Sequence, residues 1–346
     1  MEHPVTISDV ARRAQVSPST ASKALNGRAQ VSEATRRRVL AAAHDLDYAP
    51  NAFAQNLRTG RSRTVGIIAA DGVGRFTLPV LMGASHAFGS EQMAVLLYDS
   101  HGDPELERRN LDALVKHQAD GVIMLGQHTD ARPPVSHAAR MPIVYAYAPS
   151  SDPRDCSVVP DEADGARQAI EHLVQQGYRR IAHITGPSTF HATRVRLESV
   201  KETLAEHGLT LAGSRPYVGE WSEQWGMSAT IMLLTEDPSI DAIFCGNDQL
   251  ARGAVDAARD MGRRVPDDLG IVGFDDWDAF TLGSRPPLSS VDMRLEELGR
   301  RAAHQLFGSR TERDRGRVTV PCELIPRDSS QRLPAVAAAR SKGEGG

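Results

Sequence analysis

The feature that most constrains the fold is an alternation of short apolar runs and amphipathic helical segments that begins after Arg63. The runs predicted to be strands are Val65–Ala69, Ala94–Tyr98, Gly121–Leu125, Ile143–Tyr147, Ile181–Thr185, Ala242–Cys245 and Gly270–Phe274. Helical spacing of apolar residues marks the segments between them, for example Pro104–His117, Asp161–Gln176, Ala192–His207 and Gln249–Met261. This alternation is typical of parallel sheets with helices on both faces. Because these strands are too many for one small sheet, we expect two similar α/β lobes.

The residues before about 50 show a different pattern, three short helices. Thr6 followed by Asp9 is a capping-box signature for the first helix. Ser17 is a suitable cap for the second, with Pro18 at its first position, and a third is expected from Ser32 to Leu46. This arrangement predicts a helix-turn-helix unit, because the small polar side chains outside the second helix suit a major groove about 12 Å wide. An ordinary three-helix bundle is the alternative.

The charge distribution favours a head that binds a polyanion. Residues 1–62 hold nine Lys/Arg and five Asp/Glu, a formal charge of +4, whereas the remainder holds 31 and 39, a charge of −8. A small basic module on a larger acidic body is typical of nucleic-acid binding.

The stretch "VTISDVARRAQVSPSTASKALNG", continued by "VSEATRRRVLAAAHDLDYAPNAFAQNLRTGRSRTVGII", resembles the N-terminus of the LacI/GalR (lactose/galactose repressor) family. The likeness resumes along nearly the whole chain and implies a transcriptional regulator, with repression expected. It implies double-stranded DNA as a partner. The DNA-binding positions that it implies are Thr6, Ser17, Pro18, Ser19, Thr20, Ser22, Lys23, Asn26, Asn51, Gln55 and Leu57. Pro18 can offer only an apolar contact, for instance to a thymine methyl, whereas Lys23 can reach guanine O6 and N7.

Residues 51–62, after a helix-turn-helix domain at 1–50, resemble the hinge helix and linker of that family. A helix as short as Asn51–Leu57 is marginal alone in water. The resemblance implies that it orders only when two copies meet in the minor groove, with Leu57 as the apolar wedge that kinks the duplex. Docking of Leu57 against its own domain is the alternative.

The rest of the chain resembles the type I periplasmic-binding-protein-like effector domain of the family. The segments that carry this likeness are "DGVIMLG", "HLVQQGYRRIAHITGP", "IDAIFCGNDQLARGAVDAARDMGRRVPDDLGIVGFDD" and "PPLSSVDMRLEELGRRAA". The implied ligand-binding and dimerisation domain spans 63–331, with crossings near Val159, Ser290 and Val320. The first lobe would cover about 63–159 and 291–320, the second about 160–290 and 321–331. Ligand is expected between the lobes, at the carboxyl ends of the strands.

The tail, residues 332–346, is rich in Gly and Ala and has no leucine heptads, so we expect it to be disordered. Without a coiled coil for tetramer formation, a homodimer is favoured, and its two-fold symmetry predicts a pseudo-palindromic operator.

The resemblance implies effector contacts at Phe76, Tyr147, Arg196, Trp221, Asn247 and Asp275. An Arg fork and carboxylates suit vicinal hydroxyls, and aromatic faces cover a sugar ring or stack on a base. A sugar is the expected effector; a purine or nucleoside acting as co-repressor is the alternative. Ala148 stands where some sugar-responsive members carry a polar residue, so Tyr147 is assigned in its place. Asp248 and Asp276 suit helix capping as well as ligand contact and are not assigned.

This fold class also includes enzymes, which carry recognisable catalytic motifs. "GVGRFT" begins like a dinucleotide-binding loop, but Thr77 stands at the third glycine position. The sequence contains no phosphate loop, nucleophile elbow or zinc-protease motif, and its twelve histidines form no evident ligand set. We therefore expect no enzyme activity, no metal and no cofactor.

The N-terminal stretch has no apolar export signal, and no run of about 18 apolar residues occurs. The expectation is a cytoplasmic protein without membrane contact, which argues against the remaining alternative, a sugar-binding transport protein. Cys156, Cys245 and Cys322 are too widely spaced for a metal site or disulfide framework, so reduced thiols are expected.

Overall fold

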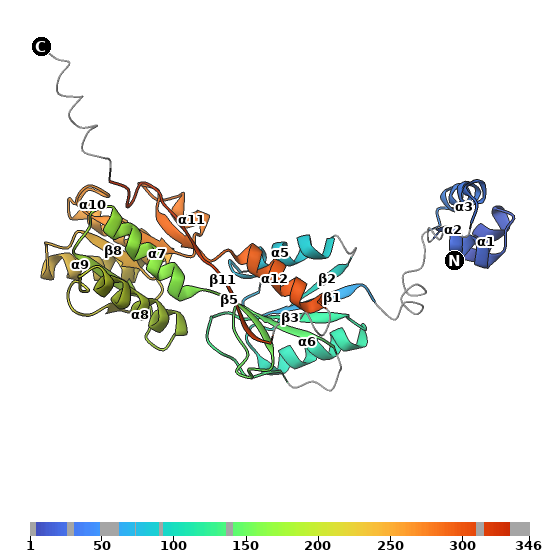
Figure 1. Ribbon diagram of the computed structural model, residues 1–346, viewed down its shortest axis with the longest axis horizontal. Coiled ribbons are helices and arrows are strands. Elements are labelled where there is room, and N and C mark those ends of the chain that lie inside the picture. The colour runs from blue at the N-terminus through green and yellow to red at the C-terminus, as the bar shows by residue number, and fades with distance from the viewer. Residues whose placement is uncertain are drawn as a thin grey trace, which may run out of the picture. The chain divides into compact units, whose positions relative to one another are not determined.

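A computed structural model describes residues 5–25, 31–48, 62–72, 74–89, 93–135, 141–308 and 315–332. Backbone contacts divide the chain into two units, Met1–Ser62 and Arg63–Gly346, which are called the head and the body below (Figure 1). The prediction for the tail lies outside the described residues from residue 333 onward, and so do four predicted DNA-binding positions, Asn26, Asn51, Gln55 and Leu57.

In the head, the described residues form α1 (Ile7–Arg13), α2 (Pro18–Leu25) and α3 (Glu33–Asp45). The predicted capping box is present, because Thr6 Oγ1 accepts the Asp9 N–H and the Asp9 carboxylate accepts the Thr6 N–H. Ser17 and Ser32 accept N–H groups at the starts of α2 and α3. The helices enclose a small core of Val10, Ala11, Ala14, Ala21, Ala24, Val39, Ala42 and Ala43.

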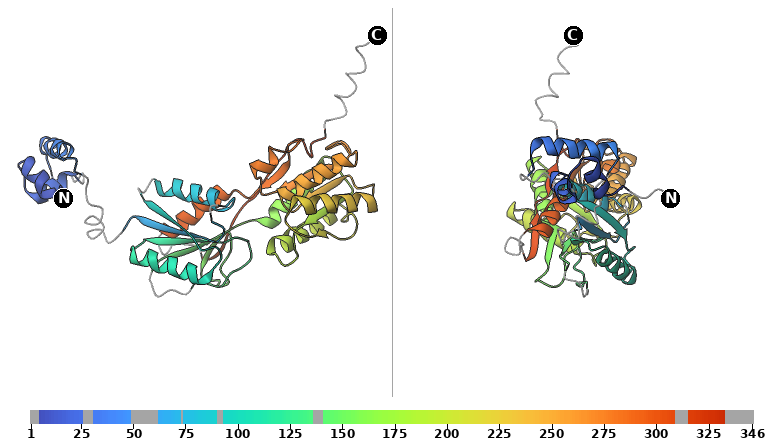
Figure 2. Two further views of the ribbon diagram at one scale, coloured as in Figure 1. Left: turned by 180° about the vertical axis from the view of Figure 1, so that it is seen from behind. Right: turned by 90° about the vertical axis from the view of Figure 1, so that its right-hand side faces the viewer.

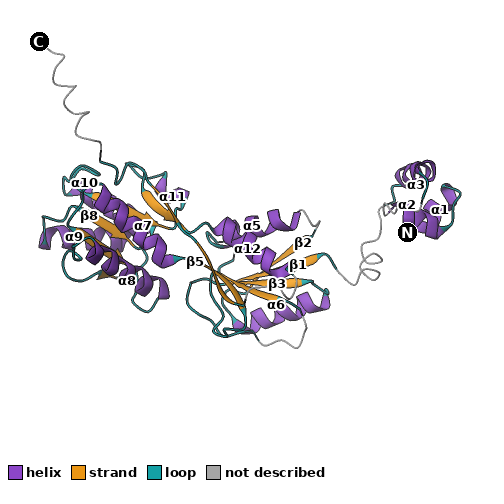
Figure 3. Cartoon of the chain, in the orientation of Figure 1, coloured by secondary structure: helices purple, strands orange, loops and turns teal. Residues whose placement is uncertain are grey.

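The first lobe of the body contains a parallel sheet with strand order β11-β5-β4-β3-β1-β2. Helices α5 and α12 pack on one face of this sheet and α6 on the other (Figures 1 and 3). The strands are β1 (Thr64–Ala69), β2 (Ala94–Asp99), β3 (Gly121–Leu125), β4 (Ile143–Ala146), β5 (Cys156–Pro160) and β11 (Gly316–Val320). The helices are α5 (Thr77–Gly89), α6 (Pro104–Lys116) and α12 (Leu295–Phe307).

The second lobe repeats this order as β12-β10-β9-β8-β6-β7. Helices α7 and α8 cover one face and α9 and α10 the other, as the views from two sides show (Figure 2). The strands are β6 (Ile181–Thr185), β7 (Tyr217–Val218), β8 (Ala242–Cys245), β9 (Gly270–Phe274), β10 (Ser289–Asp292) and β12 (Glu323–Ile325). The helices are α7 (Glu162–Gln175), α8 (His191–Glu206), α9 (Glu223–Glu236), α10 (Asp248–Asp260) and α11 (Asp278–Thr281). Strand β12 runs antiparallel to β10. This sheet is therefore mixed, whereas a parallel sheet was predicted.

The chain passes between the lobes after β5, after β10 and between β11 and β12. The predicted boundary at residues 290 and 291 is two residues early. Val291 and Asp292 still pair with β12 in the second sheet, so the crossing follows Asp292. At the first crossing, Pro160 still pairs with Val320 in the first sheet, so Pro160 belongs to the first lobe rather than to the second.

Paired helices are in close backbone contact in both lobes. In the first lobe, a Cβ on Gly83 of α5 would overlap the Glu296 carbonyl, and one on Gly299 of α12 would overlap that of Val80. At these two positions the helices therefore pack without an intervening side chain. Among the described residues, no helix combines the length and apolar character needed to cross a membrane.

Candidate functional site

The head presents a polar surface along α2. Ser17, Pro18, Ser19 and Lys23 are exposed, and Ala21 and Ala24 are buried beneath them. The hydroxyl of Ser17 lies 2.9 Å from those of Ser19 and Thr20. Thr20 and Ser22 are half-buried, and Thr6 is exposed at the start of α1. The described part of the predicted DNA-binding set therefore lies on the solvent side of the head.

A cavity of about 220 Å³ lies between the two lobes of the body. It is lined by the segments that follow β1, β3, β4, β6, β7, β8 and β9, including the first turns of α8, so it opens at the carboxyl ends of strands from both sheets. All six predicted effector residues line it: Phe76, Tyr147, Arg196, Trp221, Asn247 and Asp275. The structure thus brings together residues that are up to 199 positions apart in the sequence.

Eight further residues line the same cavity and were not singled out from the sequence. They are Asp71, Arg75, Gln127, His128, Thr129, Asp130, Phe190 and Ala192. Most of them directly follow strands that were predicted correctly. The rule that ligands bind beyond the carboxyl ends of parallel strands could have identified these loops.

Arg196 is fixed by contacts within its own lobe. Its Nε lies 2.5 Å from Glu162 Oε2, Nη1 donates to the Gly246 carbonyl, and the guanidinium stacks 3.5 Å from the centre of the Phe274 ring. Both charged side chains of this ion pair are at most 4% exposed. Two of the guanidinium nitrogens thus bind protein groups, although Arg196 also lines the cavity.

Asp275 forms an ion pair across the cleft. Its Oδ2 lies 3.0 Å from Nη1 of Arg75, which belongs to the first lobe. Burial raises the pKa of Asp275, while Arg75 and Arg196 act to lower it. Neither Asp275 Oδ2 nor Arg75 Nη1 makes a hydrogen bond within the described part of the chain, so the geometry leaves hydrogen-bonding capacity on both atoms.

A second contact between the lobes lies beside the cavity. Asp130, after β3, accepts the N–H of His191 at 2.8 Å in the first turn of α8. The N-cap of α8, Phe190, supplies no capping side chain, so a carboxylate from the opposite lobe caps the helix. His128 contacts the Phe190 ring, and burial lowers its pKa, so His128 is neutral near pH 7.

Aromatic rings and a few polar groups complete the lining. Phe76 and Tyr147 stack with 4.9 Å between ring centres, and Trp221 lies 6.1 Å from Phe190. Burial raises the pKa of Tyr147 well above its usual value, so its phenol stays protonated. Asn247 Oδ1 caps α10 by accepting the Leu250 N–H, while its amide nitrogen lies 3.4 Å from Gln249 Oε1.

This arrangement can hold a small ring-shaped ligand that carries hydrogen-bonding groups. The described residues include no group of three or more His, Cys, Asp or Glu side chains placed to hold a metal. Buried polar atoms without hydrogen bonds among the described residues line the cavity next to aromatic rings; they are Thr129 Oγ1, Arg75 Nη1 and Asp275 Oδ2. Such atoms are stabilised when a ligand supplies the missing partners.

A helix-turn-helix head followed by two α/β lobes around a ligand-sized cleft defines a class of protein, the ligand-responsive DNA-binding regulators. Residues 6–51 match the model of the bacterial regulatory proteins of the lacI family, and residues 170–330 match the periplasmic binding protein-like domain. The chain belongs to the LacI family. It is a DNA-binding transcriptional regulator.

Similar proteins cover nearly the whole chain. The transcriptional repressor PurR of Haemophilus influenzae is 30% identical over 94% of this chain and 98% of its own. The regulator CelR of Thermobifida fusca is 32% identical over 92% of this chain and 95% of its own. The solved Lac repressor dimer bound to operator and the anti-inducer ONPF has a TM-score of 0.76 at 26% identity, covering 95% of this chain and all of that one. A CelR–cellobiose complex has a TM-score of 0.63 at 28% identity, and the match covers 94% of this chain and 99% of that one. These relatives are regulators rather than enzymes.

Proposed function

We propose that this chain is a cytoplasmic repressor that binds a pseudo-palindromic operator as a homodimer, and that a small neutral sugar in the cleft controls its operator affinity. The observation that carries the proposal is the cavity between the lobes, where aromatic rings adjoin buried polar atoms that have no hydrogen-bond partner in the described part of the chain. The volume of about 220 Å³ is below the roughly 300–1,000 Å³ of common ligand pockets. It therefore favours a ligand the size of a single sugar ring.

The charges around the cavity favour a neutral ligand over a phosphorylated or acidic one. Arg75 pairs with Asp275, Arg196 pairs with Glu162, and His128 is neutral. Among the described lining residues, no cation therefore lacks a carboxylate partner. Recognition of phosphate or carboxylate uses Arg or Lys groups that can form charge-assisted hydrogen bonds.

A thermal-shift screen tests the ligand class, because a ligand that binds only the folded state raises the apparent stability. The panel contains neutral monosaccharides, their phosphates, hexuronic acids, cellobiose, purine bases and nucleosides. Stabilisation by neutral monosaccharides supports the proposal. Stabilisation by phosphates, acids, bases or nucleosides alone would contradict it and assign the cleft to that ligand class.

Exposed apolar side chains on the body support the homodimer. Leu78 and Met82 of α5 are 47% and 42% exposed, and Trp277 and Leu282, which flank α11, are 36% and 53% exposed. Leu78 and Met82 are four residues apart on α5 and therefore share one face of this helix, and adjacent exposed apolar side chains can mark a protein–protein contact. Sedimentation equilibrium should give twice the chain mass of 37.5 kDa. Replacing Leu78 and Met82 by Glu should shift the protein towards monomer.

Residues 1–62 alone are expected to bind DNA weakly and with steep salt dependence. Each phosphate contact releases counterions, which contributes a slope of about −0.9 to the log–log salt dependence. The full chain should bind a selected operator more tightly and more selectively, since a dimer presents two heads. Fluorescence anisotropy across a salt series measures both; equal operator affinity of the head and the full chain would contradict the dimer model.

The Leu57→Ala change is expected to weaken operator binding and to reduce DNA bending, while ligand binding and non-specific DNA binding persist. The reason is that an apolar wedge acts only on specific, kinked DNA. A circular-permutation gel measures the bend angle. Wild-type bending by the variant would remove Leu57 from the wedge role.

A further inference from the structure

The ligand-facing carboxylate of Asp275 is carried by an unusual turn after β9. Asp275 has a φ of 102° and Asp276 a φ of 49°, both in the region that favours glycine. Two successive side-chain-bearing residues in this conformation persist only where the surroundings hold them. The contacts of this turn therefore decide where the Asp275 carboxylate points.

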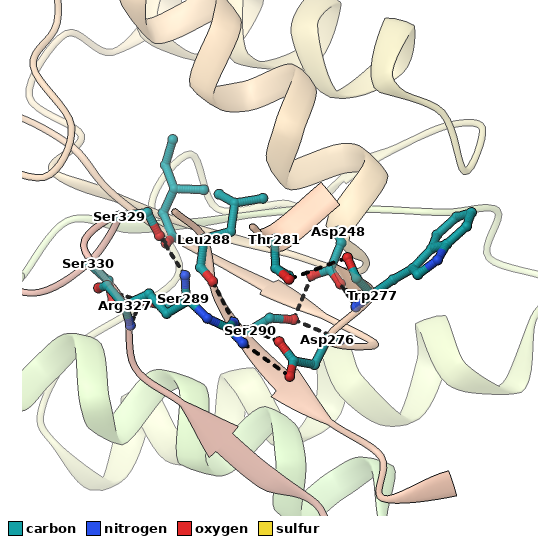
Figure 4. Close-up of polar contacts among 11 residues, drawn as sticks. Asp248, Asp276, Trp277, Thr281, Leu288, Ser289, Ser290, Arg327, Ser329 and Ser330 are labelled. Atoms are coloured by element: carbon teal, nitrogen blue, oxygen red, sulfur yellow. Dashed lines mark hydrogen bonds and ion pairs between the residues drawn. The ribbon is translucent and has the colours of Figure 1, made fainter. Parts of the chain in front are cut away.

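The Asp276 side chain binds Arg327, which lies after β12 (Figure 4). Arg327 Nη1 and Nη2 approach the two Asp276 oxygens to 2.6 and 3.2 Å, and Nη1 also donates to the Leu288 carbonyl at 2.8 Å. Both charged side chains are largely buried, with exposed fractions of 17% and 16%. A two-pronged contact of this kind fixes orientation as well as distance.

The backbone of the turn is held by three separate partners. The Asp275 N–H donates to the Val291 carbonyl, the Asp276 N–H to Ser290 Oγ at 3.1 Å, and the Trp277 N–H to Asp248 Oδ2 at 2.7 Å. Ser290 Oγ in turn donates to Asp248 Oδ1 at 2.5 Å. Every N–H of the turn is thus bound to β10 or α10.

Arg327 is itself anchored to β10. Ser289 Oγ donates to the Arg327 carbonyl and accepts the Arg327 N–H, at 2.8 and 2.7 Å. Ser330 Oγ contacts Ser289 Oγ and also His172 Nε2 of α7, each at 2.7 Å. Figure 4 shows the side chains of this network converging on the first residues of β10. The anchor therefore connects the ligand turn to the strands through which the chain crosses between the lobes.

We propose that Arg327 and Asp276 are positioning residues of the cleft: their ion pair holds the Asp275–Trp277 turn in its strained conformation and so aims the Asp275 carboxylate at the cavity. Neither residue lines that cavity. The inference rests on the proposed function for its relevance to ligand binding. Its tests need no ligand, so their failure would leave the proposed ligand class untouched.

Hydrogen exchange of the full-length protein tests whether the pair holds the turn. Arg327→Lys keeps the charge but loses the two-pronged contact, and Asp276→Asn keeps the shape but loses the charge. In both variants the Asp276 and Trp277 amides should exchange faster by about ten-fold or more, while the amides of β9 keep their wild-type rates. Arg132→Lys is the matched control, because Arg132 contacts Glu107 at 2.8 and 2.6 Å with similar burial in the other lobe.

Wild-type exchange at Asp276 and Trp277 in Arg327→Lys would overturn the proposal. Equal acceleration throughout β9 would also overturn it, because the pair would then only stabilise the lobe.

The ion pair between Arg75 and Asp275 provides a second readout, which reports where the Asp275 carboxylate lies. A double-mutant cycle with Arg75→Gln and Asp275→Asn, followed by urea unfolding, measures their coupling. If Arg327 aims Asp275, the coupling should be several-fold or more in the unfolding equilibrium constant in the wild-type background and close to unity in Arg327→Lys. Equal coupling in both backgrounds would show that Arg327 does not position Asp275.

Discussion

Replacing Arg196 by Met should lower the unfolding free energy of the body by about 3–5 kcal/mol, because it leaves a buried carboxylate without its partner. Arg196 and Glu162 are both almost wholly buried, and the guanidinium also binds the Gly246 carbonyl and the Phe274 ring. The side chain thus supports the second lobe as well as the cleft. Loss of ligand binding in this variant would reflect the fold and the site together.

Urea unfolding followed by circular dichroism measures this effect. The double variant with Arg196→Met and Glu162→Leu should recover much of the lost stability, since replacing both members of a buried pair by apolar groups is often near neutral. Arg264→Met removes an exposed pair with Asp268 and should leave the unfolding midpoint unchanged. Wild-type stability of the Arg196→Met variant would contradict the assigned structural role.

The Asp275→Asn change should weaken ligand binding by about ten- to a hundred-fold, as expected for the loss of a charge-assisted hydrogen bond of roughly 1.5–3 kcal/mol. The Asp275 carboxylate is buried, and its Oδ2 has no hydrogen-bond partner among the described residues. A ligand donor can satisfy this atom, whereas the amide of Asn is a weaker acceptor. Operator binding without ligand should stay near the wild-type value, because the head and hinge are unchanged.

Calorimetric titration with the sugar found in the thermal-shift screen measures the affinity. Asp256→Asn, on the outside of α10 where Asp256 pairs with Arg252, is the matched carboxylate control and should bind as the wild type does. Undiminished affinity of the Asp275→Asn variant would remove Asp275 from the ligand site.

The predicted strands and helices agree closely with the structure where apolar runs are long and buried. The runs Gly121–Leu125 and Gly270–Phe274 match β3 and β9 residue for residue. The strands at the crossings, β5, β10, β11 and β12, were not identified as strands from their sequence pattern. Strand β10 is only four residues long and contains Ser289 and Ser290, whose hydroxyls bind the network beneath the cleft, so it has no apolar signature.

The sequence allowed six residues of the candidate site to be named, but not the ion pairs that two of them form. The family resemblance assigned Asp275, Phe76 and Asn247 to the effector site, and all three line the cavity. Its partner Arg75 was missed because the ion pair joins residues 200 positions apart in two different lobes, and no local pattern records such a contact. For the same reason, the pairing of Arg196 with Glu162, which is 34 positions away, was not predicted.

The claim that cleft occupancy controls operator affinity is tested most directly by one titration. A fluorescent operator fragment is titrated with wild-type protein and with Asp275→Asn, with and without a saturating concentration of the screened sugar, at constant salt. The account predicts that the sugar changes the operator dissociation constant of the wild type by about five-fold or more, in either direction, and changes that of the variant much less. A sugar that binds the wild type in the calorimeter yet leaves its operator affinity unchanged would contradict the account.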